Sequence, residues 1–360
     1  MTALLCFSHL SWNFVYQRPQ HLMSRLAKKY QVYYIEEPRP GNQYFYQTEK
    51  IDSLTVVRLF FNEAEGYNNE RLATLVNKFI KEQQITAYDA WYYTPMALAF
   101  TKDLQPERVI YDCMDELANF RFAPPELLKL EDELFQHTDL VFTGGHTLYE
   151  AKKHRHHNIY PFPSSIDKAH FEQARIGLQD PADQSAIPKP RFGFYGVVDE
   201  RFDTRLIAEA AALRPDWQFV IIGPIVKISE DELPKAQNIH YLGGKTYNEL
   251  PVYISNWQVA LIPFAINKST EFISPTKTPE YLAGGLPVIS TPIKDVVTPY
   301  GREGLVSIVN NAEEFVKAGE EILSNHQKKE WLEKVDVFLA DNSWDRTFSR
   351  MVDLIDNINN

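Results

Sequence analysis

Cysteine is scarce in this sequence, and the two cysteines form no pattern. Cys6 and Cys113 are the only ones in the 360 residues, and both lie in or beside short apolar segments that predict core strands. Disulfide frameworks and zinc sites need spaced sets of cysteine or histidine ligands. The pair therefore favours a reducing compartment and argues against a structural zinc site.

Other absences exclude further classes of protein. No apolar run approaches about 18 residues, the length that predicts a membrane-spanning helix, and the first residues lack the basic start of a secretory signal. A formal net charge of −11 argues against a general nucleic-acid binder. No G-x-G-x-x-G follows a predicted strand, which disfavours a Rossmann dehydrogenase. We therefore expect a soluble cytoplasmic protein.

Short apolar segments alternate with amphipathic ones along most of the chain. Strands are predicted at residues 3–8, 32–35, 54–60, 90–93, 108–111 and 140–142, with helices at 19–29, 68–81, 126–136 and 146–153 between them. The alternation restarts at 191–195 and continues through 218–222, 239–242, 259–262 and 286–290. This order is typical of βαβ units, so we predict an α/β protein with two parallel-sheet, Rossmann-like domains.

The division between these domains is also readable. Residues 1–165 form the expected first domain, and residues 190–343 the second. Residues 166–189 are polar, contain prolines and show weak periodicity, so they predict a linker. A final helix over residues 344–360 carries a stripe of apolar side chains that could pack on the first domain.

The stretch at residues 274–291 organises the second half. It predicts a turn at Ser274 and Pro275, a short helix from about Thr276, and a stop at a glycine pair before a buried strand. First-turn N–H groups attract anions, and Lys277 would add a positive charge. One turn later, Glu280 offers a carboxylate suited to paired sugar hydroxyls. The alternative is a helix that packs on a sheet for structural reasons alone.

Three further loops follow strands of the second half. Gly196 and Arg201 follow the first strand, Lys227 the second and Gly243 the third. Carboxyl ends of parallel strands share one edge of a sheet, where ligands bind. Glycine lets the backbone approach a ligand, and arginine can bind a phosphate with two hydrogen bonds. Ordinary glycine turns are the alternative for each loop taken alone.

Polar side chains also follow strands of the first half. His9 and Trp12 come after the first strand, and Arg18 and His21 open the next helix. We predict substrate contacts for these residues, with a solvated loop as the alternative.

Two aspartates, Asp112 and Asp115, end another strand of the first half. Asp115 could remove a proton from an attacking hydroxyl, or could instead cap a helix beginning at Glu116. Asp112 is predicted to contact substrate.

A family resemblance joins these features. Pro-x-Lys-x-x-Glu-Tyr-Leu-Ala-x-Gly-x-Pro-Val, at residues 275–288, resembles the donor-binding segment of GT-B glycosyltransferases. Residues 14–27, 91–95, 111–116, 142–145 and 162–165 resemble bacterial GT-B enzymes that build surface polysaccharides, of the teichuronic-acid-biosynthesis kind. The resemblance implies two Rossmann-like domains facing across a cleft, with the C-terminal helix crossing back to the first.

The resemblance also implies an activity. The protein would move a sugar from a nucleotide diphosphate donor to a hydroxyl of a glycan or lipid-linked saccharide, in cell-envelope polysaccharide biosynthesis. Its second domain would bind the donor, with Glu280 on the ribose, and its first domain the acceptor, with Asp115 as base. No Asp-x-Asp follows a strand, and Glu131, Asp132 and Glu133 are predicted on the solvated face of an amphipathic helix, so we expect no metal, and we expect no cofactor.

Several alternatives stay open. Related retaining enzymes carry E-x7-E, with the first glutamate on the donor sugar, whereas Glu271 and Glu280 form E-x8-E. If the reaction retains configuration, Asp115 would orient the acceptor instead of acting as a base. A sugar-nucleotide 2-epimerase and a non-catalytic nucleotide- or glycan-binding subunit share the architecture. The basic helix end near His154 could contact anionic headgroups at the cytoplasmic face of a membrane, with a solvated turn as the alternative.

Overall fold

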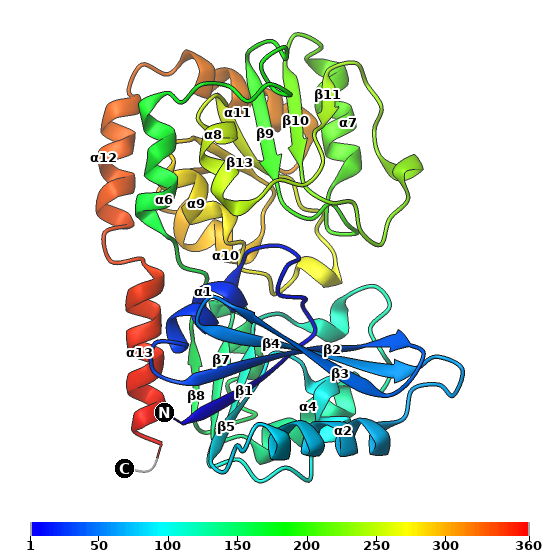
Figure 1. Ribbon diagram of the computed structural model, residues 1–360. Helices are drawn as coiled ribbons and strands as arrows, with labels where there is room; N and C mark the ends of the chain where they lie inside the picture. Colours follow the sequence, from blue (N-terminus) through cyan, green and yellow to red (C-terminus); the bar gives the residue numbers. More distant parts are fainter. Residues whose placement is uncertain (1, 359–360) are drawn as a thin grey trace. The chain divides into compact units, whose positions relative to one another are not determined.

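The computed structural model describes residues 2–358, which divide into two compact units. Unit 1 contains the chain up to Pro163 and again from Thr347 onwards, and unit 2 contains Ser164–Arg346. Each unit is built on its own sheet (Figure 1). The stretch at residues 166–189, expected to be an irregular linker, instead forms short helices within unit 2 and buries Phe171.

Unit 1 is an eight-stranded sheet with helices packed on it. Its strands, in the order β3-β4-β2-β1-β5-β6-β7-β8 across the sheet, are β1 (Ala3–Ser8), β2 (Gln31–Gly41), β3 (Phe45–Ile51), β4 (Leu54–Asn62), β5 (Tyr88–Tyr92), β6 (Val109–Cys113), β7 (Leu140–Thr143) and β8 (Ile159–Pro161). All neighbouring pairs are parallel except β3 with β4. The sheet therefore has its topological switch between β1 and β5.

The helices of unit 1 connect these strands. They are α1 (Arg18–Leu26), α2 (Asn69–Glu82), α3 (Leu98–Thr101), α4 (Leu127–His137) and α5 (His146–Lys152), with short 3₁₀ turns η1 (Pro95–Ala97) and η2 (Leu117–Asn119). The C-terminal helix α13 (Trp344–Asp356) also packs here, where Arg108 donates to the Ile355 carbonyl at 3.1 Å.

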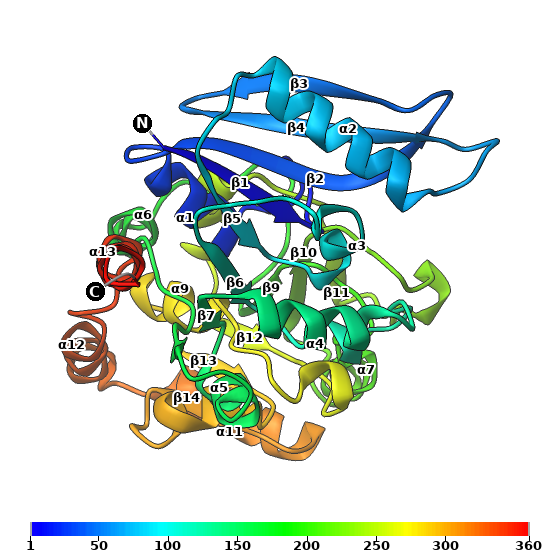
Figure 2. The ribbon, with the colours of Figure 1, turned by 90° about the horizontal axis from the view of Figure 1, so that it is seen from below.

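The hairpin of β3 and β4 was not expected from the sequence. Residues 36–38, which follow the strand predicted at residues 32–35, continue β2, and β3 pairs with β4 along its whole length. The helix α2 lies along these two strands (Figure 2), where the Phe79 ring meets Tyr46 edge-on at 5.3 Å. Only one face of β3 has such a cover, so its sequence lacks a long apolar run.

Unit 2 is a six-stranded parallel sheet in the order β11-β10-β9-β12-β13-β14. Its strands are β9 (Arg191–Tyr195), β10 (Gln218–Ile222), β11 (Ile239–Tyr241), β12 (Val259–Ile262), β13 (Val288–Ser290) and β14 (Val306–Ile308). This is the strand order of a dinucleotide-type Rossmann sheet, whose switch point lies at the carboxyl ends of β9 and β12.

The helices of unit 2 cover both faces of this sheet. They are α6 (Lys168–Glu172), α7 (Thr204–Leu213), α8 (Leu250–Ile254), α9 (Lys277–Ala283), α10 (Lys294–Val296), α11 (Ala312–Ser324) and α12 (Lys328–Phe338), with η3 (Gln173–Ile176), η4 (Glu230–Glu232), η5 (Tyr247–Glu249), η6 (Lys268–Thr270) and the π-turn η7 (Val297–Gly301).

Alternating residues of β9 show why the core has two sides. Phe192 stacks on Trp217 at 4.2 Å and meets Phe315 of α11 at 5.9 Å. On the other face, a Cβ atom at Gly193 would lie 2.1 Å from the Trp257 ring, so only glycine fits beneath that indole. The prediction of an α/β protein with two Rossmann-like domains is confirmed.

Candidate functional site

Two glycines bring the loops after β9 and β10 into close contact. Gly196 and Gly223 have φ of 142° and 141°, a region that side chains disfavour. A Cβ atom at Gly223 would lie 1.8 Å from the Gly196 carbonyl oxygen. Gly223 N also donates to the Gly243 carbonyl at 2.9 Å. The three predicted glycine loops therefore meet at one edge of the unit 2 sheet.

The side chain of Lys277 reaches the same edge. A Cβ atom at Gly196 would lie 2.2 Å from Lys277 Cε and 2.8 Å from Nζ. The ammonium also lies 5.5 and 5.6 Å from the ring centroids of Phe194 and Phe264, within cation–π range. Glycine at 196 thus leaves the space that Lys277 occupies.

The helix that presents Lys277 begins slightly later than the sequence predicted. Lys277 is the first residue of α9 and Thr276 is its N-cap, without a side-chain capping bond. Pro275 therefore precedes the cap, instead of occupying the first helical position. The helix ends as expected at Gly284, and Gly285 has φ of 74°. Ser274 contributes its carbonyl, which accepts from Ser164 Oγ at 3.0 Å.

Glu280 lies one turn into α9 and is almost fully buried. Tyr195 Oη donates to Glu280 Oε2 at 2.5 Å. Burial raises the pKa of Glu280 from 4.5 to about 7, although the Tyr195 hydrogen bond and the Lys277 charge act in the lowering direction. A carboxylate held this way is a strong hydrogen-bond acceptor once ionised.

Tyr195 was missed in the sequence analysis. It is the last residue of β9, directly before Gly196, and its backbone N–H donates to the hydroxyl oxygen of Tyr281 at 2.9 Å. A tyrosine at the carboxyl end of a central strand is the only signal that the sequence offers. The structure shows that this tyrosine orients Glu280.

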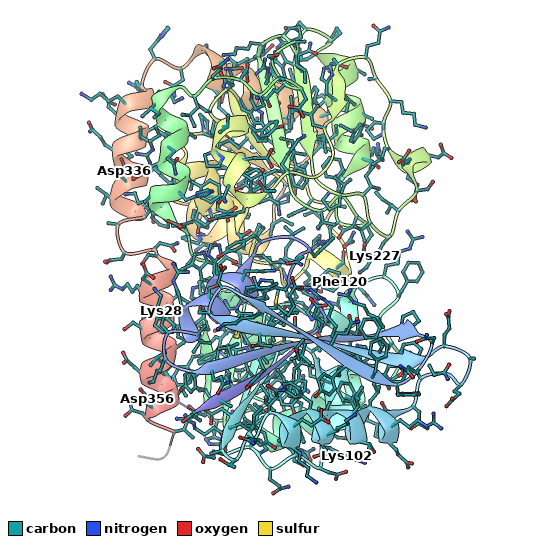
Figure 3. All side chains as sticks on the ribbon, in the orientation of Figure 1. Lys28, Lys102, Phe120, Lys227, Asp336 and Asp356 are labelled. Atoms are coloured by element: carbon teal, nitrogen blue, oxygen red, sulfur yellow. The ribbon has the colours of Figure 1, made fainter. Side chains whose placement is uncertain are left out.

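The other predicted donor-side cations already contact carboxylates. Arg201 Nε lies 2.9 Å from Asp199 Oδ1, and its Nη2 lies 2.6 Å from Oδ2. Lys227, in the loop after β10 (Figure 3), lies 3.7 Å from Glu200. A phosphate near these cations would share them with the carboxylates, so Lys277 is the more direct candidate.

Glu271 lies on the same side of unit 2, after η6. Its Oε1 is 3.1 Å from Lys294 Nζ, and both side chains are largely exposed. Its predicted contact with a donor sugar stays a prediction.

In unit 1, the predicted loop after β1 is anchored by main-chain contacts. Trp12 N donates to Glu36 Oε1 at 2.9 Å, and the Trp12 ring meets Tyr34 edge-on at 4.9 Å. His9 is half-buried in this loop. His21 is buried in α1, where its ring packs edge-on against Tyr16 at 4.7 Å, so it is less accessible than the sequence suggested.

Arg18 and Asp112 require a correction. The Arg18 guanidinium donates to both oxygens of Asp112 at 2.8–3.1 Å and to the Phe162 carbonyl at 2.6 Å. The Asp112 side chain is fully buried and that of Arg18 nearly so. Instead of contacting substrate, the pair ties α1 to the end of β6 and to the segment after β8.

Asp115 follows this pair in the loop after β6 and is half-buried. Burial acts to lower the pKa of Arg18, but Asp112 raises it, and Tyr93 and then Asp115 add smaller contributions in the same raising direction. The short turn η2 begins at Leu117 with Glu116 as its cap residue and has no side-chain capping bond. Gly144, from the loop after β7, packs against this segment, since a Cβ atom there would lie 2.0 Å from the Met114 carbonyl oxygen.

A second correction concerns the charged face of α4. Glu131, expected on a solvated face, is buried and accepts from Lys152 at 2.7 Å, from Arg155 at 2.5 Å and from Tyr111 at 2.9 Å. Glu116 is 2.8 Å from the same lysine. Two cations of the basic helix end are therefore neutralised inside unit 1, which weakens its case as a headgroup contact.

Within residues 2–358, no cluster of three or more histidine, cysteine or acidic side chains is arranged to hold a metal ion. No helix in that range is long and apolar enough to cross a membrane.

Comparisons with known proteins follow the same lines. Residues 189–325 match the family described as "Glycosyl transferases group 1". The chain is 25% identical over 284 residues to the "Putative teichuronic acid biosynthesis glycosyltransferase TuaH" of Bacillus subtilis strain 168, covering 73% of this chain and 70% of that one. The predicted resemblance, and the prediction of a glycosyltransferase, are confirmed.

Solved structures share the fold. A sucrose-phosphate synthase from Thermosynechococcus elongatus superposes with a TM-score of 0.71 at 14% identity, over 99% of each chain. A structure described as "Trehalose-6-phosphate from E. coli bound with UDP-2-fluoro glucose" gives a TM-score of 0.72 at 13% identity, over 98% of this chain and 99% of that one. The GT-B fold is therefore confirmed, and the comparisons do not favour the epimerase alternative.

Proposed function

We propose that the protein transfers a sugar from a nucleotide diphosphate donor to a hydroxyl of a glycan or lipid-linked saccharide in polysaccharide biosynthesis. The observation that carries this proposal is the placement of Lys277 against Gly196, one turn before the buried Glu280. An ammonium beside close-packed glycine loops suits a diphosphate, and a carboxylate one turn away suits the hydroxyls of a ribose.

The choice of donor rests on the same edge of unit 2. Lys277 would neutralise the negative charge that develops on the leaving diphosphate. Stabilisation of such developing charge is usually the largest contribution to catalysis. The E. coli structure with the shared fold is described with a bound UDP-sugar, so uridine nucleotides are the first to test. We propose that this reaction needs no divalent metal.

Calorimetric titration with UDP, GDP, dTDP and ADP, each with and without EDTA, tests the donor site. One nucleotide should bind, equally well with EDTA, and Lys277→Ala should weaken it about ten- to a hundredfold, the range expected for a charge-assisted contact. Lys268→Ala is the matched control, because Lys268 is an exposed lysine in the loop after β12. Equal affinity for Lys277→Ala and the control would contradict the donor assignment.

On the acceptor side, we propose Asp115 as the general base, supported by its position in the loop after β6 and its partial exposure. A base must reach the proton that it removes, and Asp112, fully buried on Arg18, cannot. His9 and Trp12 remain the proposed acceptor contacts.

Asp115→Asn should lower the transfer rate by about 10²–10⁴-fold, the usual contribution of a general base. Release of nucleoside diphosphate in the presence of a lipid-linked saccharide measures this rate, and calorimetry should show unchanged donor affinity. Asp103→Asn, an exposed aspartate elsewhere in unit 1, is the control. An unchanged rate would remove Asp115 as base, and a lowered melting temperature would assign it a structural role.

A further inference from the structure

A separate cavity lies at the opposite edge of the unit 2 sheet. Gln258, Pro287 and Leu305 line it, and each of them directly precedes a strand, β12, β13 or β14. The donor-side residues follow strands, so the cavity is at the amino ends of the same sheet. Its volume of about 360 Å³ is within the usual size of small-molecule sites.

The walls of this cavity combine aromatic and aliphatic side chains with the polar side chains of Gln258, Ser307 and Asn325. Trp331 is partly exposed and lines the cavity beside Val288 and Leu305, whereas Trp257 is only 3% exposed because its ring packs beneath Gly193 in the core. Trp257 Nε1 donates to Gln184 Oε1 at 2.8 Å, and Trp331 Nε1 donates to the Leu305 carbonyl at 3.3 Å. Both indole N–H groups are thus satisfied within the protein, so Trp331 offers ring carbons to a ligand.

One charge faces this cavity. Among the described residues that line it, Lys328 at the start of α12 is the only charged one, and no carboxylate is included. The Lys328 side chain forms no ion pair or hydrogen bond within residues 2–358. Lys328 as a whole is exposed, but desolvation of its ammonium group lowers the pKa of this side chain.

The combination of these features specifies a ligand class. A lysine beside a cavity whose lining includes no carboxylate attracts an anion. Trp331 and the neighbouring aliphatic side chains favour a ligand with a flat or branched apolar body. The acidic side chains Glu330 and Glu333 of the same helix line a different, more open hollow, which shares only Leu305 with this cavity.

We propose that the cavity between the amino ends of β12–β14 and the start of α12 binds a small organic monoanion with an aromatic or branched apolar body. The anionic group would lie at Lys328 and the apolar body against Trp331. This site is distinct from the proposed donor site, and the proposal does not depend on the donor assignment.

The probe is 1-anilinonaphthalene-8-sulfonate, which joins a sulfonate to an apolar ring system, and its neutral analogue N-phenyl-1-naphthylamine lacks the sulfonate. The sulfonate probe should bind the folded protein at one site and quench tryptophan emission by energy transfer. Trp331→Phe should reduce that transfer. Lys328→Gln should weaken the sulfonate probe about five- to tenfold, by loss of one charge-assisted contact, and leave the neutral analogue unchanged.

Lys329→Gln is the matched control, because Lys329 is the next residue of α12 and does not line the cavity. Both variants change an exposed lysine, so equal melting temperatures are expected. Equal probe affinity for Lys328→Gln and Lys329→Gln would overturn the proposal. Complete displacement of the probe by a nucleotide would overturn it as well, since the probe would then occupy the donor edge.

Discussion

At the scale of single residues, burial decides which charged groups act on a ligand. Glu280 and Asp112 are both buried carboxylates, but their surroundings differ. The Arg18 guanidinium neutralises Asp112 and donates a hydrogen bond to each of its two oxygens. Glu280 instead accepts one hydrogen bond from the Tyr195 hydroxyl, and the charge near it is that of Lys277. Glu280 is thus the carboxylate with unsatisfied capacity to accept hydrogen bonds from a ligand.

Glu280 should make binding and stability depend on pH near 7. Its folded pKa, raised from 4.5 to about 7, means that the folded state binds the proton more tightly than the unfolded state. Stability from this group is therefore greatest below pH 4.5 and falls by about 3 kcal/mol as pH rises to 7. If the ribose hydroxyls bind the ionised form of Glu280, donor affinity should rise as the pH increases through about 7.

Calorimetry with an intact nucleotide sugar from pH 6 to 8.5 checks this, because its diphosphate has no second phosphate ionisation near 6. Tyr195→Phe should shift the affinity midpoint to higher pH, since the Tyr195 hydrogen bond lowers the Glu280 pKa. Glu280→Gln should remove the pH dependence altogether. A pH dependence that persists in Glu280→Gln would assign it to another group.

At the scale of elements, the loops after parallel strands are set by close backbone approaches. The loop after β6 carries Asp115, and the loop after β7 supports it at Gly144. The Gly144 N–H also donates to the Cys113 carbonyl at 2.9 Å. The position of the proposed base therefore depends on a glycine that is about thirty residues away in sequence.

Gly144→Ala should displace the Met114–Asp115 segment, because its Cβ would overlap the Met114 carbonyl. We expect a stability loss of about 1–3 kcal/mol from this overpacking, together with slower transfer and unchanged donor affinity. Chemical denaturation and the transfer assay measure the two effects. Gly244→Ala is the control, since a Cβ there would meet open space, and equal behaviour of the two variants would contradict the argument.

At the scale of the whole molecule, the last helix belongs with the first residues. The α13 side chains of Met351 and Ile355 are buried, Lys29 lies within ion-pair distance of Asp356, and Arg350 lies over the Phe162 ring at 5.2 Å. Unit 1 is therefore completed only by residues near the end of the chain.

Met351→Ala combined with Ile355→Ala should destabilise unit 1, at about 2–5 kcal/mol for each truncation. Asp353→Ala, on the exposed face of the same helix, should cost little. Hydrogen exchange measured peptide by peptide should show faster exchange in β1, β5 and β6, with unit 2 unchanged. Uniform acceleration in both units would contradict the assignment of α13 to unit 1.

The sequence by itself determined the fold class and most of the parallel strands, because buried strands are short apolar runs between turn residues. It also determined α9 and its glycine stop, since these follow from local order, and the family resemblance led to the roles proposed for Lys277 and Glu280. It missed β3, whose exposed, polar residues show no buried run.

Only the tertiary structure decided which polar residues are available to a ligand. Arg18 and Asp112 are 94 positions apart yet form one buried ion pair, and Glu131 is neutralised by cations more than twenty residues away. The hydrogen bond from Tyr195 to Glu280 is likewise created by packing α9 against the end of β9. Local sequence sets backbone conformation, but the partners of a buried charge come from distant parts of the chain, and those partners decide whether the charge holds the fold together or binds a substrate.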